Sequence, residues 1–124
     1  LTEQTKYLIN DYSISKMKDG VMIINTGRGQ LIHTNALIEG LKNKKIGSAG
    51  LDVYEEESQY FYEDRSDKII DDDTLARLLS FNNVIVTSHQ AYFTQEALSN
   101  IATTTLQNVK DFTLGKALEN EVKL

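Results

Sequence analysis

Three groups of residues with chemically useful side chains each follow a short apolar run. In the first group, Arg28 stands between two glycines in the segment Asn25-Thr26-Gly27-Arg28-Gly29. The planar guanidinium group of an arginine can donate two parallel hydrogen bonds to a carboxylate, and flanking glycines let a ligand come close to the backbone. The segment therefore predicts a carboxylate-binding loop, with an ordinary surface turn as the alternative. It is no dinucleotide fingerprint, because Ile32 stands where G-x-G-x-x-G requires its third glycine.

The second and third groups supply acids and a histidine. Asp52 lies between two apolar residues, so we expect it to be buried and hydrogen-bonded. Three glutamates follow at 55–57, for which a solvated loop is the alternative. His89 comes soon after the apolar run 84–86, and histidine is the side chain best suited to move a proton near neutral pH. A purely structural histidine is the alternative there.

Apolar patterning predicts the elements that must position these groups. Residues 21–24, 46–53 and 84–86 read as strands, the first of them buried on both faces. Helical spacing predicts two short helices within residues 1–19, one of them headed by Ser13, and further helices over 34–45, 74–79 and 94–111. Thr34 or Asn35 is the expected cap of the helix over 34–45, and Asp73 or Thr74 that of the helix over 74–79. Residues 54–73 read as a long polar connection.

This order of elements is the α/β pattern of a parallel sheet with right-handed crossovers. Ligands of such sheets collect at the carboxyl ends of the strands, so Arg28, the segment 52–57 and His89 are expected at one rim. Together they offer a carboxylate anchor, a charge that raises the pKa of the histidine, and a proton donor. That set suits the reduction of a 2-oxo acid.

Composition excludes several other classes of protein. The 124 residues fit a single domain, and the net charge of −5 without a basic run argues against nucleic acid as a partner. No apolar run is long enough to span a membrane, and no residue is a cysteine, so a cytoplasmic location is expected. The acid runs 55–57 and 71–73 lack the spacing of calcium loops, and no metal site is predicted. The absence of proline and the start at Leu1 indicate part of a longer chain.

The chain resembles the carboxyl-terminal part of the D-isomer-specific 2-hydroxyacid dehydrogenases, and among them the fermentative D-lactate dehydrogenases. The resemblance covers essentially the whole chain and rests on these motifs: Tyr7-Leu8-Ile9-Asn10, Met17-Lys18-Asp19-Gly20, Ile24-Asn25-Thr26-Gly27-Arg28-Gly29, Gly50-Leu51-Asp52-Val53-Tyr54-Glu55, Tyr60-Phe61-Tyr62 and Thr87-Ser88-His89-Gln90-Ala91-Tyr92. It implies an α/β fold in which residues 1–90 are the second half of a Rossmann-like doubly wound parallel sheet, the C-terminal half of an NAD-binding domain. Residues 91–124 are then a helical segment that returns to a substrate domain absent from this sequence.

The same resemblance implies a mechanism. Arg28 holds the carboxylate of pyruvate and polarises its carbonyl group, His89 donates the proton, and Glu57 pairs with His89 to keep it protonated. Hydride comes from NADH. The positions that match cofactor contacts in the family are Thr5, Thr26, Gly27, Arg28 and Asp52. Gly27 departs from the serine that is common there, which loosens the loop but leaves the arginine in place.

Further implications concern the assembly and the alternatives. The complete enzyme is expected to be a homodimer that acts on small 2-oxo and 2-hydroxy acids. The family's phosphate-binding loop and its ribose-binding acid would lie upstream of Leu1, so residues 1–124 alone are expected to be inactive. The alternatives are a dimeric NAD-sensing regulator of the same fold, or a structural fragment without chemistry of its own.

Overall fold

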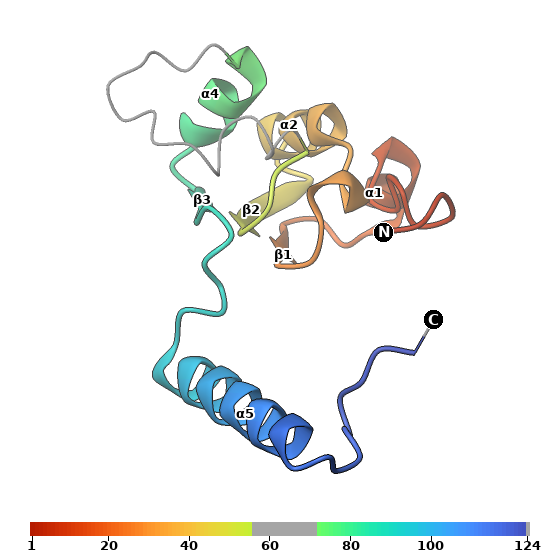
Figure 1. Cartoon of the computed structure of the whole chain (residues 1–124). Helices are drawn as coiled ribbons and strands as arrows, with labels where there is room; N and C mark the ends of the chain where they lie inside the picture. The colour runs from red at the N-terminus through yellow and green to blue at the C-terminus, as the bar shows by residue number, and fades with distance from the viewer. Residues whose placement is uncertain (56–71, 124) are drawn as a thin grey trace. The chain divides into compact units, whose positions relative to one another are not determined.

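The computed structural model describes residues 1–55 and 72–123, which fall into two compact units, Leu1–Gln90 and Ala91–Leu124. The strands lie in the first unit (Figure 1). The predicted site residue Glu57 and the motif residues 60–62 lie outside the described residues. Each unit is described separately below.

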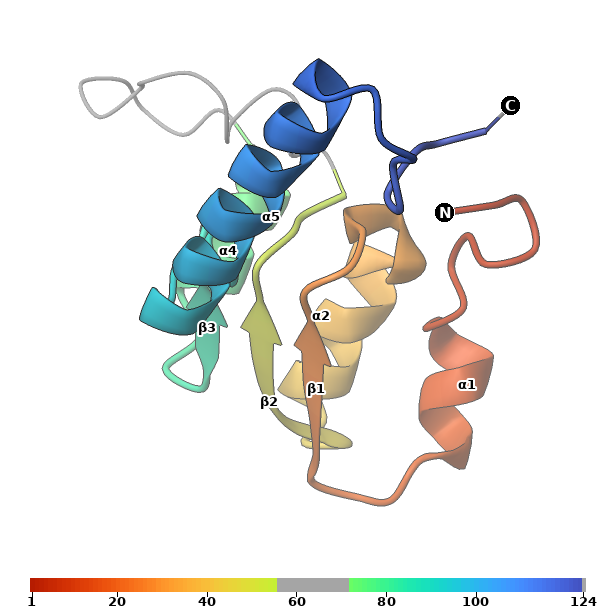
Figure 2. The ribbon, with the colours of Figure 1, turned by 60° about the horizontal axis from the view of Figure 1, so that its bottom comes forward.

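A three-stranded parallel sheet forms the centre of the first unit, in the order β1 (Val21–Asn25), β2 (Ile46–Leu51) and β3 (Val84–Val86). Figure 2 shows the three arrows pointing the same way. Asn25 pairs with Leu51 and Leu51 pairs with Val86, so the strands end at the same level. The fold predicted from the sequence, an α/β unit with a parallel sheet, is confirmed.

Helices cover one face of this sheet. α2 (Thr34–Lys42) packs on β2, and α4 (Asp73–Leu79) packs on β3 and on α2. Leu37, Ile46 and Leu78 are almost completely buried between these layers. Burial of these side chains and of the rest of the apolar core stabilises this unit, because apolar area is removed from water.

The opposite face of the sheet carries exposed apolar side chains. Met22 and Ile24 on β1 are 64% and 69% exposed, and Ile85 on β3 is 68% exposed. Side chains of a strand alternate between the two faces, so these residues point away from α2 and α4. The prediction that the first strand is buried on both faces is therefore wrong for the described residues, because both crossover helices lie on one side.

The start of the chain differs from the sequence prediction. Residues 1–9 form turns rather than a helix, and α1 (Asp11–Lys16) begins after Asn10, not at Ser13. Asn10 and Ser13 form a reciprocal capping box, in which the Asn10 side chain accepts from the Ser13 amide at 3.1 Å and the Ser13 hydroxyl accepts from the Asn10 amide at 2.9 Å. Ser13 is therefore the third residue of the helix.

Two other caps also differ from the prediction by one position. Asp72, rather than Asp73 or Thr74, caps α4 by accepting from the amides of Thr74 and Leu75. α2 begins at Thr34 itself, after His33, whose side chain makes no capping bond. Thr34 is the first residue of the helix, and its amide donates to a carboxylate from another segment, described below.

The second unit contains one long helix, α5 (Gln95–Thr113). Thr94, the first residue of the helix expected from the sequence, is instead its cap and accepts from the amide of Ala97 at 3.2 Å. Gly115 follows the helix in the left-handed conformation, with φ of 64°. None of the helices within residues 1–55 and 72–123 is long and apolar enough to cross a membrane.

Candidate functional site

Backbone hydrogen bonds join the three strand-end segments at one edge of the sheet. The amide of Asp52 donates to the carbonyl of Asn25 at 2.9 Å, and the amide of His89 donates to the carbonyl of Asp52 at 2.6 Å. The loop that carries Arg28 follows Asn25 directly. The structure therefore brings these loops together as expected, and we call this edge the rim. Glu57 lies outside the described residues.

A buried asparagine supports the Arg28 loop from below. Asn25 is 7% exposed, its side-chain oxygen accepts from the Gly27 amide at 3.1 Å, and its side-chain nitrogen donates to the Arg28 carbonyl at 3.0 Å. The Arg28 guanidinium is exposed and donates to the carbonyl of Gly27 at 2.8 Å. Asn25 fixes the loop backbone, while the charged end of Arg28 stays at the surface, where a carboxylate can reach it.

The two glycines of this loop have different roles. A β-carbon on Gly29 would lie 1.9 Å from the carbonyl oxygen of Tyr54, so only glycine fits between the two backbones. A β-carbon on Gly27 would meet its nearest atom, on Leu31, at 3.3 Å, and Gly27 is exposed together with Thr26. The expectation that both glycines admit a ligand is therefore wrong for Gly29, which is needed for packing against the chain after β2.

Asp52 holds the turn that carries His89. It is 5% exposed, and one of its carboxylate oxygens accepts from the Thr87 hydroxyl and from the Gln90 amide, both at 2.6 Å. Ser88 and His89 lie between these two residues and have φ of 29° and 57°, respectively. This left-handed conformation is unfavourable for residues with a β-carbon. The prediction that Asp52 is buried and hydrogen-bonded is confirmed, and its hydrogen bonds explain how this strained turn persists.

Glu55 is a residue that the sequence reasoning missed. The sequence pattern favours a solvated loop for the three glutamates, but the carboxylate of Glu55 accepts from the Tyr7 hydroxyl and, at 3.2 and 2.7 Å, from the amide and hydroxyl of Thr34. Partial burial raises the pKa of Glu55, but these hydrogen bonds and the nearby His33 outweigh it and hold the pKa below its ordinary value. No sequence signal pairs residues that lie so far apart along the chain.

The N-terminal segment runs alongside the loop that follows Arg28. The amides of Tyr7 and Ile9 donate to the carbonyls of Gln30 and Leu31 at 2.8 and 3.0 Å. Thr5 precedes this contact and is half-buried, with its hydroxyl oxygen accepting from the Thr2 amide at 2.8 Å. Figure 2 shows the segment at the same end of the first unit as the carboxyl ends of the strands.

The open part of the rim is compatible with a nucleotide cofactor. Thr26, Gly27 and Arg28 are all exposed, and Gly27 presents its backbone without a side chain. Beneath them, a cavity of about 10 Å³ lined by Asn25 and Tyr54 holds at most about one water molecule. A cofactor would thus lie on the rim and not inside the unit. Within the described part of the chain, no group of three acidic, histidine or cysteine side chains could hold a metal ion.

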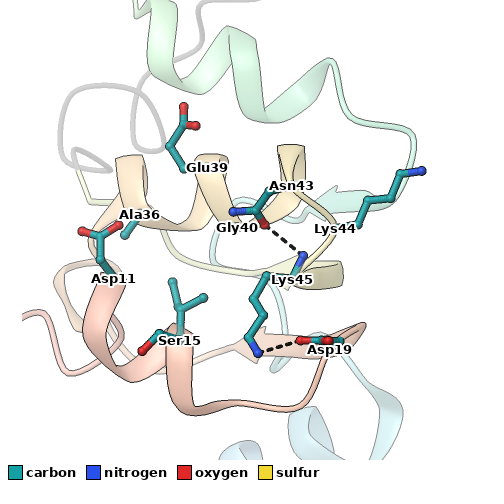
Figure 3. A pocket seen from close by; sticks show the side chains of 10 residues that line it. Asp11, Ser15, Asp19, Ala36, Glu39, Gly40, Asn43, Lys44 and Lys45 are labelled. Carbon is teal, nitrogen blue, oxygen red and sulfur yellow. Dashed lines mark hydrogen bonds and ion pairs between the residues drawn. The ribbon is translucent and has the colours of Figure 1, made fainter.

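A larger hollow lies away from the rim. Figure 3 shows it between α1 and α2, where its volume is about 510 Å³ and its wall includes Asp11, Glu39 and Lys44. An ion pair at its edge joins Lys45 to Asp19 at 2.6 Å. Of the predicted site residues that the structure describes, none lines this hollow, so it is separate from that part of the candidate site.

Comparisons with known proteins agree with this geometry. Residues 1–91 match the family model described as "D-isomer specific 2-hydroxyacid dehydrogenase, NAD binding domain". The D-lactate dehydrogenase of Escherichia coli K12 is 49% identical over 122 residues, which are 98% of this chain and 37% of that protein. An aromatic 2-oxoacid reductase of Clostridium sporogenes is 49% identical over 121 residues, 98% of this chain and 37% of that protein.

A solved structure gives the same result. The D-lactate dehydrogenase of Lactobacillus jensenii with NAD⁺ matches with a TM-score of 0.88 at 33% identity, over 100% of this chain and 37% of that one. The chain thus spans about a third of the length of the relatives that it matches.

Proposed function

The chain belongs to the D-isomer-specific 2-hydroxyacid dehydrogenases, in the region of their NAD-binding domain, and from this premise we propose that it is the C-terminal part of an NAD-dependent enzyme that interconverts pyruvate and D-lactate. The observation that carries the proposal is the rim, where hydrogen bonds tie the Arg28 loop, Asp52 and the His89 turn together. Residues 1–90 would be the second half of the NAD-binding domain, and 91–124 the helical segment that returns to the substrate domain. The complete enzyme would be a cytoplasmic homodimer.

Arg28 would bind the substrate. Its guanidinium is exposed at the rim, and the loop beneath it is fixed by Asn25. Two parallel hydrogen bonds from the guanidinium would anchor the carboxylate of a 2-oxo acid and draw electron density from the neighbouring carbonyl. Its hydrogen bond to the Gly27 carbonyl uses a single guanidinium nitrogen, so other N–H groups would be available to the substrate carboxylate.

His89 would transfer the proton. Protonated imidazole can donate to the oxygen of the substrate carbonyl during reduction and recover the proton during oxidation. Glu57, by analogy with the family, would pair with His89 and favour its protonated form. The side chain of His89 is half-buried, and its backbone amide donates a hydrogen bond to the carbonyl of Asp52, so its position would be set before substrate binds.

NAD would lie on the open part of the rim, held by Thr5, Thr26, Gly27, Arg28 and Asp52. When reduced, it supplies the hydride that the protein's own side chains cannot supply. The exposed backbone at Thr26 and Gly27 supports this placement, because it leaves room for close approach. Asp52 would contribute from a buried position, through its carboxylate at the base of the His89 turn.

A chimera tests the proposal directly. Residues 1–124 would replace the matching segment of the Escherichia coli D-lactate dehydrogenase, and pyruvate reduction would be followed by NADH absorbance. We expect activity in the chimera and none in residues 1–124 alone. Arg28→Lys should raise the KM for pyruvate because the second hydrogen bond is lost, whereas the control Arg77→Lys on α4 should leave it unchanged.

The possible failures of this experiment have different meanings. A folded chimera that binds NADH without turnover would favour the NAD-sensing regulator over the enzyme. A normal KM for Arg28→Lys would remove Arg28 from substrate binding. Dehydrogenase-level rates from residues 1–124 alone would contradict the proposal that the active site also needs residues upstream of Leu1.

A further inference from the structure

The Glu55 carboxylate accepts hydrogen bonds from two different segments, the N-terminal segment and the start of α2. One carboxylate oxygen accepts from the hydroxyl of Tyr7, in the N-terminal segment. The other accepts from the amide and the hydroxyl of Thr34, at the first residue of α2. Glu55 itself follows β2 by a few residues, so a single side chain joins the N-terminal segment, α2 and the chain that leaves the sheet.

The Thr34 end of this bridge is well fixed. Thr34 is 6% exposed, and its amide is one of the four amides at the start of a helix that lack a partner within the helix. A carboxylate there is also stabilised by the helix dipole. No side chain next to α2 in sequence caps it, because His33 makes no such bond. Glu55 therefore provides the hydrogen-bond acceptor that the first amide of α2 needs, and this contact fixes the position of the Glu55 carboxylate.

The Tyr7 end holds a strained residue. Tyr7 has φ of 53°, which is unfavourable for a residue with a β-carbon. Among the contacts that maintain it are the backbone hydrogen bond to Gln30, the edge-to-face packing of its ring on His33 at 5.1 Å, and the hydrogen bond from its hydroxyl to Glu55. A conformation of this kind persists only where its surroundings enforce it. The bridge thus fixes the path of the N-terminal segment as well as capping a helix.

We propose that Glu55 is a positioning residue of the cofactor site, which clasps the N-terminal segment to the start of α2 and thereby sets the place of Thr5 at the rim. The inference rests on the proposed function, since Thr5 is one of the proposed NAD contacts. Thr5 precedes Tyr7 by two residues, so a change in the backbone position of Tyr7 also displaces Thr5. Glu55 would act on the cofactor through this segment, without contacting substrate.

Tyr7→Phe tests the clasp with the smallest change. It removes the hydroxyl, keeps the ring on His33, and leaves Glu55 bonded to Thr34. In the complete enzyme we expect the Kd for NADH to rise at least about tenfold, the loss that corresponds to the weaker end of the range for one hydrogen bond to a charged acceptor. kcat at saturating NADH and pyruvate should stay within about twofold, because no reacting group has moved.

Two further variants serve as comparison. Tyr12→Phe makes the same chemical change on α1 at a side chain that is 74% exposed, and it should leave the Kd unchanged. Glu55→Gln should raise the Kd as Tyr7→Phe does. A Tyr7→Phe enzyme with normal NADH affinity would overturn the proposal, because Glu55 would then only cap α2.

Amide hydrogen exchange in residues 1–124 separates this proposal from the proposed function. In Tyr7→Phe the amides of Tyr7 and Ile9, which bond to Gln30 and Leu31, should exchange faster than in the wild type and in Tyr12→Phe. Unchanged exchange would disprove the clasp even if NADH binds. Faster exchange in residues 1–124, together with a complete enzyme that does not bind NADH at all, would keep the clasp and reject the proposed function and the role of the clasp at a cofactor site.

Discussion

Replacing Asp52 should loosen the His89 turn by an amount that follows from its hydrogen bonds. The carboxylate accepts from the Thr87 hydroxyl and the Gln90 amide at 2.6 Å each. A hydrogen bond to a charged group contributes about 1.5 to 3 kcal/mol. Because Thr87 and Gln90 are exposed and can bond to water once Asp52 is removed, the lower figure applies, and the two bonds together come to about 3 kcal/mol.

Relaxation of the turn offsets part of this loss. Ser88 and His89 are left-handed, at a cost of about 1 to 2 kcal/mol each, and the turn recovers some of that energy when it is released. We therefore expect Asp52→Ala to lower the free energy of unfolding by about 2 kcal/mol. Asp52→Asn keeps an oxygen that can accept both bonds but loses the charge, which about halves their strength, so its loss should be about 1 kcal/mol.

Urea unfolding of residues 1–124, followed by circular dichroism, measures these differences. Amide exchange of His89 and Gln90 reports the turn itself, and both amides should exchange faster in the two variants. Asp19→Asn is the matched control, because it removes the same charge from an exposed surface ion pair with Lys45. A loss below about 0.5 kcal/mol for Asp52→Ala, or unchanged exchange at Gln90, would refute the view that Asp52 holds this turn.

Three further outcomes are expected. Gly29→Ala should destabilise the first unit by at least about 2 kcal/mol, because its methyl group would collide with the backbone of Tyr54, whereas Gly27→Ala should be tolerated; equal urea midpoints would contradict this difference. The folded-state pKa of Glu55 is lowered, so its stabilisation is present above its ordinary pKa of 4.5 and is lost as the pH falls through the folded value. The stability gap between wild type and Glu55→Gln, measured by urea unfolding from pH 7 to pH 3, should therefore shrink on acidification; a constant gap would argue against it. In the complete enzyme, His89→Gln should lower kcat at least about 10²-fold, and unchanged turnover would exclude His89 as the proton donor.

Local patterns predicted most of the elements and their order, although residues 1–9 form turns instead of a helix. The apolar run 84–86 became β3 with the predicted bounds, and the helical spacing over 94–111 became α5. These predictions needed only nearest-neighbour chemistry, because strand propensity, helical spacing and capping act within a few residues. The placement of ligand-facing groups at strand ends followed from the parallel topology, since the carboxyl ends of parallel strands share one edge.

Tertiary structure decided the contacts between residues distant in sequence. The sequence alone predicted a buried, bonded Asp52, but only the fold identified Thr87 and Gln90 as its partners. The bridge made by Glu55 was invisible in the sequence, because its partners are 21 and 48 residues away and an acidic run gives no sign of pairing.

Glycine and strand burial show the same limit. Gly29 is required because a second backbone passes within contact distance of it, which no property of the residue itself reveals. Met22 and Ile24 are as apolar as their neighbours, yet they are exposed because both crossover helices lie on the other face of the sheet. Sequence patterns fix which side chains a segment offers. The partner that each side chain meets depends on how distant segments pack, and packing alone determines it.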